Sequence, residues 1–248
     1  MEMQDERFLR YDRQIRVEGF GREGQLKLKR ACVAVIGLGG LGCPSATYLA
    51  MAGVGKLKLV DKGKVDLSDL NRQFLYGPED LGKPKAKVAA EKLGSLNPDV
   101  DVEALDVELD EDSLPEVLKG ADVVLDGLDN WRTRFLVNEA CVEAGIPFVH
   151  AGIRSFYGQM TTVLPGRGPC LRCILRTTPP EEGVVPVLGP TPGVLGSLQA
   201  LEAIKVLTGL GEPLVGRLLI FDGLKMKFEE VRVDRNPSCP VCGHIEAR

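Results

Sequence analysis

Ala31-Cys32-Val33-Ala34-Val35-Ile36-Gly37-Leu38-Gly39-Gly40-Leu41-Gly42 gives the clearest structural signal in this chain. Residues 31–36 form a short, continuous apolar run, which predicts a strand buried on both faces of a parallel sheet. Four glycines follow, and we expect a helix at 44–52 with proline in its first turn. This order favours nucleotide binding, because glycines let phosphate approach the backbone and a helix N-terminus attracts negative charge.

The same alternation of strands and helices continues along the chain. We expect further strands at 56–61, 100–107, 121–126 and 147–150, with helices at 83–96 and 131–144. Such alternation predicts an α/β fold with a Rossmann-like, doubly wound and mostly parallel sheet. After Gly152 the expected strands, 158–164 and 216–233, are separated only by one helix at 197–208. Antiparallel strands should therefore extend the parallel sheet.

Length and composition indicate an ordinary globular protein. The chain has 248 residues, 44% of them apolar and 27% charged, which is enough to bury a sizeable core. We expect a single domain over residues 1–248. It comprises an N-terminal helical segment (1–29), a nucleotide-binding half (30–152) and an antiparallel extension with a metal site (153–248).

The charge balance argues against several classes of partner. The formal net charge is −4 and no polybasic run is present, so we expect binding to neither nucleic acid nor membrane. The polar start, Met1-Glu2-Met3-Gln4-Asp5-Glu6, does not resemble a secretory signal, and no apolar stretch is long enough to cross a bilayer. We therefore expect a cytoplasmic location.

Charged and amide side chains follow the second expected strand. Asp61 ends that strand, where a carboxylate accepts hydrogen bonds from ribose hydroxyls. Arg72 and Gln73 lie just beyond it, and Lys85 follows within the same crossover. These residues supply cationic and amide donors where a triphosphate would lie. They favour chemistry on the phosphates of ATP over hydride transfer from NAD, between which the glycine loop alone does not choose.

Asp129 and Asn130 end the fourth expected strand, at the edge where open α/β sheets bind ligands. An acid at this position suits Mg²⁺, which typically takes one or two carboxylates together with phosphate oxygens. Arginine and Mg²⁺ both stabilise charge that develops on a transferring phosphoryl group. The sequence therefore predicts a site for ATP and Mg²⁺.

Four of the seven cysteines form two Cys-x-x-Cys pairs, Cys170/Cys173 and Cys239/Cys242. Two such pairs predict a tetrahedral four-thiolate Zn²⁺ site with no open position, which would be structural. A redox dithiol and buried free thiols are the alternatives. Cys43 lies at a helix N-terminus, which can lower a thiol pKa, but we expect it to be a small packing residue.

Several motifs jointly resemble one family. They are Arg10-Tyr11-Asp12-Arg13-Gln14-Ile15, Gly37 to Cys43, Gly55, Asp61, Leu70-Asn71-Arg72-Gln73, Gly82-Lys83-Pro84-Lys85, Asp129-Asn130, both cysteine pairs and Gly196-Ser197-Leu198-Gln199-Ala200-Leu201-Glu202. From about residue 5 to 243 the chain is similar to the MoeB/ThiF/HesA adenylyltransferases, relatives of the ubiquitin-activating enzymes. The resemblance implies a homodimer that uses ATP and Mg²⁺ to adenylate the C-terminal Gly-Gly carboxylate of a small ubiquitin-like, β-grasp sulfur-carrier protein.

The resemblance also implies individual roles. The nucleotide would be bound by Gly37, Gly39, Gly40, Gly42, Asp61, Asp69, Arg72, Gln73, Lys85, Asp129 and Asn130. Catalysis would depend on Arg72 and Lys85 at the phosphates, Asp129 at Mg²⁺, and Arg13 reaching into the partner subunit's site as an arginine finger. The nucleophile is a carboxylate, already ionised near neutral pH, so no general base is required. We expect both histidines, His150 and His244, to be structural.

The chain departs from its family at three points. The loop after the first cysteine pair lacks the cysteine that forms a covalent intermediate, and Glu182 lies near its place. We therefore expect adenylation without a thioester on that loop. Gly63 replaces a second acid after Asp61, and Asp69 replaces an asparagine. A carboxylate at 69 would repel phosphate unless Mg²⁺ or an arginine lies between, which predicts weaker ATP binding or a shifted metal.

Two other functions remain open. A nucleotide-binding scaffold that has lost adenylation activity is suggested by Gly63, Asp69 and the absent loop thiol. An NAD-dependent oxidoreductase is disfavoured by Arg72 and Gln73 and by the lack of an acid suited to hydride transfer. The identity of the carrier protein does not follow from the sequence.

Overall fold

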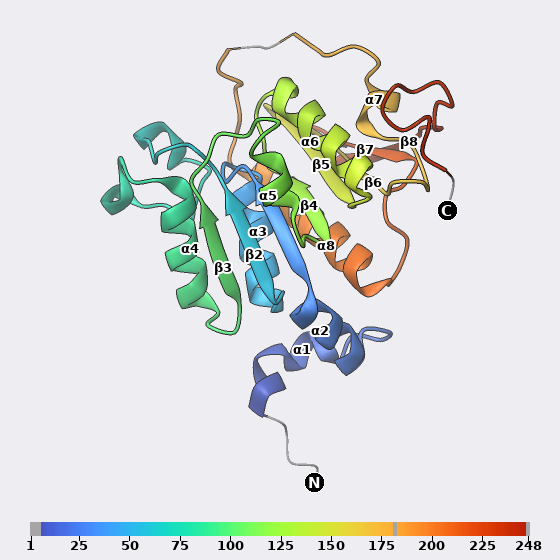
Figure 1. Cartoon of the computed structure of the whole chain (residues 1–248). Helices are drawn as coiled ribbons and strands as arrows, with labels where there is room; N and C mark the ends of the chain where they lie inside the picture. The colour runs from blue at the N-terminus through green and yellow to red at the C-terminus, as the bar shows by residue number, and fades with distance from the viewer. Residues whose placement is uncertain (1–5, 181–182, 247–248) are drawn as a thin grey trace.

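The computed structural model describes residues 6–180 and 183–246, which fold around an eight-stranded sheet (Figure 1). The strands are β1 (Cys32–Ile36), β2 (Lys56–Val60), β3 (Asp101–Leu105), β4 (Val123–Asp126), β5 (Phe148–Arg154), β6 (Tyr157–Val163), β7 (Arg217–Asp222) and β8 (Lys227–Arg232). The α-helices are α1 (Asp12–Ile15), α2 (Gly21–Arg30), α3 (Gly42–Ala52), α4 (Lys85–Leu96), α5 (Leu114–Leu118), α6 (Trp131–Ala144), α7 (Leu171–Ile174) and α8 (Pro190–Thr208). Short 3-10 turns are η1 (Glu6–Tyr11), η2 (Leu67–Asp69) and η3 (Pro78–Asp80).

The strand order across the sheet is β3-β2-β1-β4-β5-β6-β7-β8. The first five strands are parallel to one another. The order reverses between β1 and β4, where Val33 pairs with Val123 and Ile36 with Asp126. Open α/β sheets bind ligands beyond the carboxyl ends of the strands at such a reversal. The loops that follow β1 and β4 therefore define the expected binding edge.

The remaining strands are antiparallel. β5 pairs with β6 from Phe148↔Val163 to Arg154↔Tyr157, and β6, β7 and β8 continue as a meander. The predicted fold, a doubly wound mostly parallel sheet extended by antiparallel strands, is confirmed. One long sheet passes through both the glycine-loop half of the chain and the half that holds the cysteine pairs.

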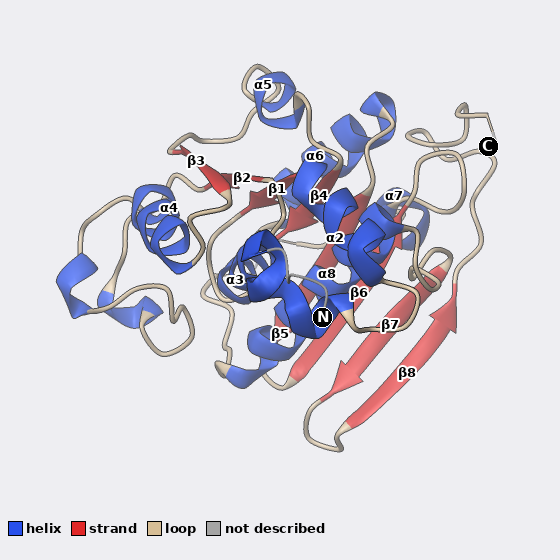
Figure 2. Ribbon diagram, turned by 90° about the horizontal axis from the view of Figure 1, so that it is seen from below, coloured by secondary structure: helices blue, strands red, loops and turns tan. Residues whose placement is uncertain are grey.

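Helices cover both faces of the parallel half (Figure 2). One core forms between the sheet and α3, α4 and α8, and it includes Val33, Val35 and Leu195. The other forms under α5 and α6 and includes Ala34, Val124 and Phe148. Alternate residues of β1 thus belong to opposite cores, which explains why this strand is apolar at every position.

Three helices differ from expectation. α8 begins at Pro190, seven residues before the expected start at 197, and α5 and α7 were not expected. Residues 190–196 are rich in proline and glycine, a composition typical of loops. Both prolines lie in the first turn of α8, where a missing N–H costs nothing, so they begin the helix instead of preventing it.

In the described part of the chain, no helix combines the length and the apolarity that crossing a membrane would need.

Candidate active site

The glycine loop after β1 is packed against the loop after β4. Gly37 has a φ of +88°, and a Cβ there would lie 2.6 Å from the backbone of Gly127. A Cβ at Gly42 would overlap the carbonyl oxygen of Gly37. Both glycines are therefore required by the protein's own packing and turn geometry.

Gly39 has a different environment. The nearest heavy atom to a Cβ at this position would be Gln73 Nε2, at 3.7 Å, so no protein group needs glycine here. Within the described residues, the backbone N–H groups of Gly39 and Gly40 donate no hydrogen bond to a backbone acceptor. Backbone N–H groups without a backbone acceptor, next to Gln73 and Arg72 and just before α3, suit a phosphate group. The loop therefore fits a nucleotide.

Asp61 follows β2 and binds the glycine loop through its carboxylate. Oδ2 accepts from the amide of Leu38 at 2.7 Å, and Oδ1 accepts from the amide of Gly63 at 2.7 Å. Each oxygen retains a lone pair, so the carboxylate can still accept from ribose hydroxyls. A Cβ at Gly63 would lie 2.9 Å from Asp61 Oδ1 and 3.6 Å from Lys85 Cδ. Gly63 thus leaves room for the Lys85 side chain.

Asp69 lies at the centre of the charged and amide side chains that were expected around the phosphates. Its carboxylate accepts from Lys85 Nζ at 2.9 Å, from Gln73 Nε2 at 2.7 Å and from Arg72 Nη2 at 3.4 Å. Oδ2 also accepts from the amide of Asp66 at 3.0 Å, which closes a capping box around η2. The structure brings together all three phosphate donors expected from the sequence. They face the carboxylate at position 69.

Asp129 is exposed at the carboxyl end of β4, and Asn130 is half-buried beside it. Asn130 Oδ1 accepts from the amide of Thr133 at 2.9 Å and caps α6, while its Nδ2 donates to Asp129 Oδ1 at 3.4 Å. The amide of Asn130 therefore has a structural role that was not expected. The carboxylate of Asp129 is exposed at the switch-point edge.

The loop that carries Asp129 is held by a buried network missed in the sequence. Asp126 Oδ1 accepts from the amide of Leu128 at 2.9 Å, and Arg134 donates to the carbonyl of Leu128. Arg134 Nε lies 3.2 Å from Asp126 Oδ2, and His150 Nδ1 lies 2.6 Å from the same oxygen. The sequence signal for this network was an acid, Asp126, at the end of the apolar strand β4.

The charge states of Asp126 and His150 follow from burial and from the neighbouring Arg134 cation. Burial raises the pKa of Asp126, but the Arg134 charge and the His150 hydrogen bond outweigh it, and the pKa is lowered. Burial lowers the pKa of His150, so the imidazole is neutral and donates its Nδ1 proton to Asp126. The structural role expected for His150 agrees with this placement.

Arg13 lies far from the glycine loop of its own chain. It is exposed on α1, which is anchored by Asn97 Nδ2 donating to the hydroxyl of Tyr11 at 2.9 Å and by Gln14 Nε2 donating to the carbonyl of Ala52 at 2.8 Å. Ala52 ends α3 and Asn97 directly follows α4, and both helices run away from the carboxyl edge of the sheet (Figure 1). The structure does not bring Arg13 to the other site residues of the same chain.

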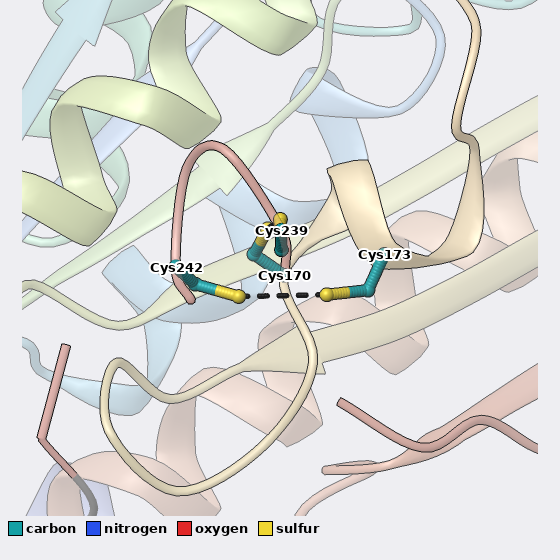
Figure 3. Close-up of side chains that lie close together, drawn as sticks. All are labelled: Cys170, Cys173, Cys239 and Cys242. Atoms are coloured by element: carbon teal, nitrogen blue, oxygen red, sulfur yellow. Dashed lines mark hydrogen bonds between the residues drawn. The ribbon is translucent and has the colours of Figure 1, made fainter. Parts of the chain in front are cut away.

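The sulfurs of Cys170, Cys173, Cys239 and Cys242 all lie within 4.8 Å of one another (Figure 3). Cys170 Sγ is 3.7 Å from Cys239 Sγ, and Cys173 Sγ is 3.4 Å from Cys242 Sγ. A tetrahedral Zn²⁺ with ordinary bond lengths places its sulfur ligands about 3.8 Å apart. The cluster fits zinc.

The surroundings of the cluster are ordered by hydrogen bonds. The amide of Asn236 donates to Cys173 Sγ at 3.4 Å, and the amide of Gly243 donates to the carbonyl of Cys239 at 2.9 Å. Cys43 lies elsewhere, fully buried beneath the glycine loop, and burial raises its pKa to about 12. It is therefore a protonated packing residue.

The loop between α7 and α8 runs from the cysteine cluster to the binding edge. The amide of Ser155 donates to the carbonyl of Pro186 at 2.6 Å, and a Cβ at Gly189 would lie 2.7 Å from the carbonyl oxygen of Asn71. The loop thus contacts the turn that carries Arg72. Glu182, expected near the place of the missing thiol, lies outside the described residues.

Comparisons with known proteins show the family to which this chain belongs. Residues 11–241 match the model of the ThiF family. A Thermus thermophilus protein named sulfur carrier protein adenylyltransferase is 47% identical over 245 residues, covering 94% of this chain and 90% of that protein. The SAMP-activating enzyme E1 of Haloferax volcanii is 47% identical over 240 residues, covering 94% of this chain and 88% of that protein. The adenylyltransferase and sulfurtransferase MOCS3 of Mus musculus is 48% identical over 241 residues, but this chain spans only 52% of its length.

Solved structures show the same fold. Escherichia coli MccB with MccA-N7isoASN superposes with a TM-score of 0.87 at 25% identity, covering 97% of this chain and 76% of that one. MccB with ATP gives a TM-score of 0.79 at 26% identity, covering 90% and 69%. The resemblance inferred from the motifs is confirmed over most of the chain. This protein belongs to the ThiF family.

Proposed function

We propose that this chain uses ATP to adenylate the C-terminal Gly-Gly carboxylate of a small ubiquitin-like, β-grasp sulfur-carrier protein. The observation that carries the proposal is the convergence of Arg72, Gln73 and Lys85 beside the glycine loop at the switch point of the sheet. Two relatives, at 47% and 48% identity, are named as adenylyltransferases, and one solved neighbour is a complex with ATP. These names support ATP as the nucleotide.

In the proposed reaction the carrier carboxylate attacks the α-phosphorus of ATP. The bond to the pyrophosphate oxygen breaks, and pyrophosphate leaves with that electron pair. The amides of Gly39 and Gly40 would hold phosphate, and Asp61 would accept from the ribose. Arg72 and Lys85 would neutralise the leaving group. No proton has to be removed from the nucleophile, which agrees with a site whose nearest histidine, His150, is buried and neutral.

Mg²⁺ would bind at Asp129, an exposed carboxylate on a loop fixed by Asp126 and Arg134. Bound there, it would supply positive charge against the phosphate oxygens. Zn²⁺ would occupy the four-cysteine cluster and tie the segment after β6 to the C-terminal segment. We assign zinc a structural role, since all four positions of a tetrahedral ion are taken by sulfur.

A protein substrate is supported by apolar surface at the binding edge. Phe156, Tyr157, Leu224, Met226 and Phe228 are exposed on and around the β5–β6 and β7–β8 turns. The amide of Gly223 donates to the carbonyl of Phe156 at 2.9 Å, so these turns are neighbours. Exposed apolar clusters of this kind mark interaction sites. We propose that the carrier docks here.

We also propose a homodimer in which Arg13 completes the partner's site. Tyr48 and Met51 on α3 and Leu201 on α8 are exposed on neighbouring helices, which suits a self-complementary interface. Residues 1–248 would act as one adenylation unit built on one sheet. A cytoplasmic location is supported by the seven cysteines, none of which forms a disulfide, since a reducing compartment preserves thiols.

ATP–pyrophosphate exchange tests the proposal. The protein is mixed with ATP, Mg²⁺, labelled pyrophosphate and a candidate β-grasp protein ending in Gly-Gly. Exchange should require the free carboxylate, and the same carrier amidated at its C-terminus should give none. Absence of exchange with every Gly-Gly carrier tried would contradict the assignment.

A nucleotide-binding scaffold is the second candidate, and one observation favours it. Asp69 pairs with Lys85 and with the side-chain amide of Gln73, which an active site would direct at phosphate. A scaffold would bind ATP with no exchange in the same assay. The NAD-dependent alternative has no such support, and it predicts nicotinamide absorbance changes that adenylation does not.

A further inference from the structure

Four donors converge on the carboxylate of Asp69. Gln73 Nε2 and Arg72 Nη2 reach Oδ1, at 2.7 Å and 3.4 Å, while Lys85 Nζ and the Asp66 amide reach Oδ2, at 2.9 Å and 3.0 Å. A carboxylate has about four lone-pair positions. The acceptor capacity of Asp69 is therefore filled by the protein itself.

The ion pair lies where water screens it poorly. The Asp69 side chain is 9% exposed and the Lys85 side chain is 13% exposed. An attraction between charges is much stronger in such surroundings than at an open surface. A phosphate oxygen that approaches Lys85 must therefore compete with Asp69, and it also meets the negative charge of Asp69 at close range.

Asp69 also fixes the orientation of Gln73. A carboxylate only accepts hydrogen bonds, so the amide nitrogen of Gln73 must point to it. Oε1 of Gln73 is buried and has no hydrogen-bond partner among the described residues. Oε1 is an acceptor and repels phosphate oxygens, while one of the two N–H groups of Nε2, which would attract them, is taken by Asp69.

We infer that Asp69 limits the affinity of this site for the phosphate chain of a nucleotide. Its carboxylate acts as an internal counter-ion for Lys85 and Arg72 and accepts a hydrogen bond from Gln73, so a phosphate that binds these donors must do so beside a buried negative charge. A neutral residue at 69 would release them and remove the repulsion. The inference rests on the proposed nucleotide site and deepens it.

Calorimetric titration of wild type and Asp69→Asn with adenosine, AMP and ATP–Mg²⁺ tests the inference. We expect Asp69→Asn to bind ATP about tenfold more tightly, the factor expected from one charge-assisted hydrogen bond. Adenosine has no phosphate, so its affinity should change by less than about twofold. The gain in affinity of Asp69→Asn over wild type should increase from adenosine to AMP to ATP.

Asp66→Asn is the matched control. Asp66 lies on the same turn and is exposed, and its carboxylate accepts from Ser68 instead of from the phosphate donors. Its ATP affinity should equal that of wild type. Thermal unfolding checks that each variant folds. Asp69→Ser, which also removes the charge and leaves the N-cap of η2, Asp66, in place, replaces Asp69→Asn if that variant does not fold.

Unchanged or weaker ATP binding by a folded Asp69 variant would overturn the inference, as would an equal gain for adenosine and ATP. Both outcomes would leave the nucleotide site intact, because wild type would still bind ATP. If wild type and the variants all fail to bind ATP, the nucleotide site itself is wrong and the proposed function fails with it.

Discussion

Asp69 and Lys85 form a 2.9 Å ion pair that joins the turn after β2 to the first residue of α4. The two residues are separated by a loop that also carries Arg72 and Gln73, and all four side chains meet at one point. The pair therefore positions the donors of the site before any ligand arrives. Preorganised donors are what a transferring phosphate needs, but here they already face a negative charge of the protein itself.

Two glycines of the same loop should respond differently to alanine. Gly37→Ala forces a positive φ and a clash with Gly127, and we expect a loss of more than about 2 kcal/mol of stability. Gly39→Ala has room for its methyl group and should cost less than about 1 kcal/mol, yet it fills the space beside the free amides and should abolish ATP binding. Urea unfolding and calorimetry separate the two effects. Strong ATP binding by Gly39→Ala would place the phosphates elsewhere.

Removing Arg134 should destabilise the fold and loosen the Asp129 loop. Arg134→Met leaves the buried carboxylate of Asp126 without its counter-ion, which typically costs about 3–5 kcal/mol. Adding Asp126→Asn to that variant should recover part of this loss, because no unpaired charge remains. In any folded variant the Mg²⁺ concentration for half-maximal exchange should rise. An unchanged Mg²⁺ requirement would show that the network supports stability alone.

The cysteine cluster should bind one zinc ion per chain. Cys239→Ser should lose the metal and lower the unfolding temperature, and a strong chelator should do the same to wild type. Cys32→Ser is the control, since this thiol lies outside the cluster. Metal analysis by mass spectrometry checks the stoichiometry. A full complement of zinc in Cys239→Ser would contradict the assignment.

Arg13 and Asp129 should complement each other across a dimer. Arg13→Ala and Asp129→Ala should each abolish exchange when tested alone. In a reassembled equal mixture, half of the dimers are mixed, and each mixed dimer has one site with Asp129 from one chain and Arg13 from the other. Activity should return to about a quarter of wild type. No recovery on mixing, with dimers demonstrated, would show that Arg13 does not act in the partner's site.

Local patterns in the sequence predicted the parts of the fold that depend on neighbouring residues. The run before Gly37 predicted β1 because both faces of that strand are buried, so every position is apolar. The four cysteines were recognisable because each pair has metal-ligand spacing within one turn. Arg72, Gln73 and Lys85 were recognisable because they follow one strand within a single crossover.

The partners of these residues were not predictable in the same way. Whether Asp69 faces solvent, a metal or Lys85 depends on how the turn packs against α4, a contact between residues 16 positions apart. The pairing of Asp126 with His150 depends on β4 and β5 being neighbours, and only the assembled sheet brings them together. Pro190 illustrates the opposite problem, since its local signal indicates a loop although packing makes it the start of α8.

The most direct test of adenylation is the mass of the carrier after one turnover. The protein, ATP–Mg²⁺ and a Gly-Gly carrier are mixed, quenched in acid and analysed by intact-mass spectrometry. We predict that the carrier gains one adenylate on its C-terminal carboxylate, that no carrier becomes attached to this chain, and that Asp129→Ala leaves the mass of the carrier unchanged. A carrier of unchanged mass while ATP remains bound and intact would contradict the account.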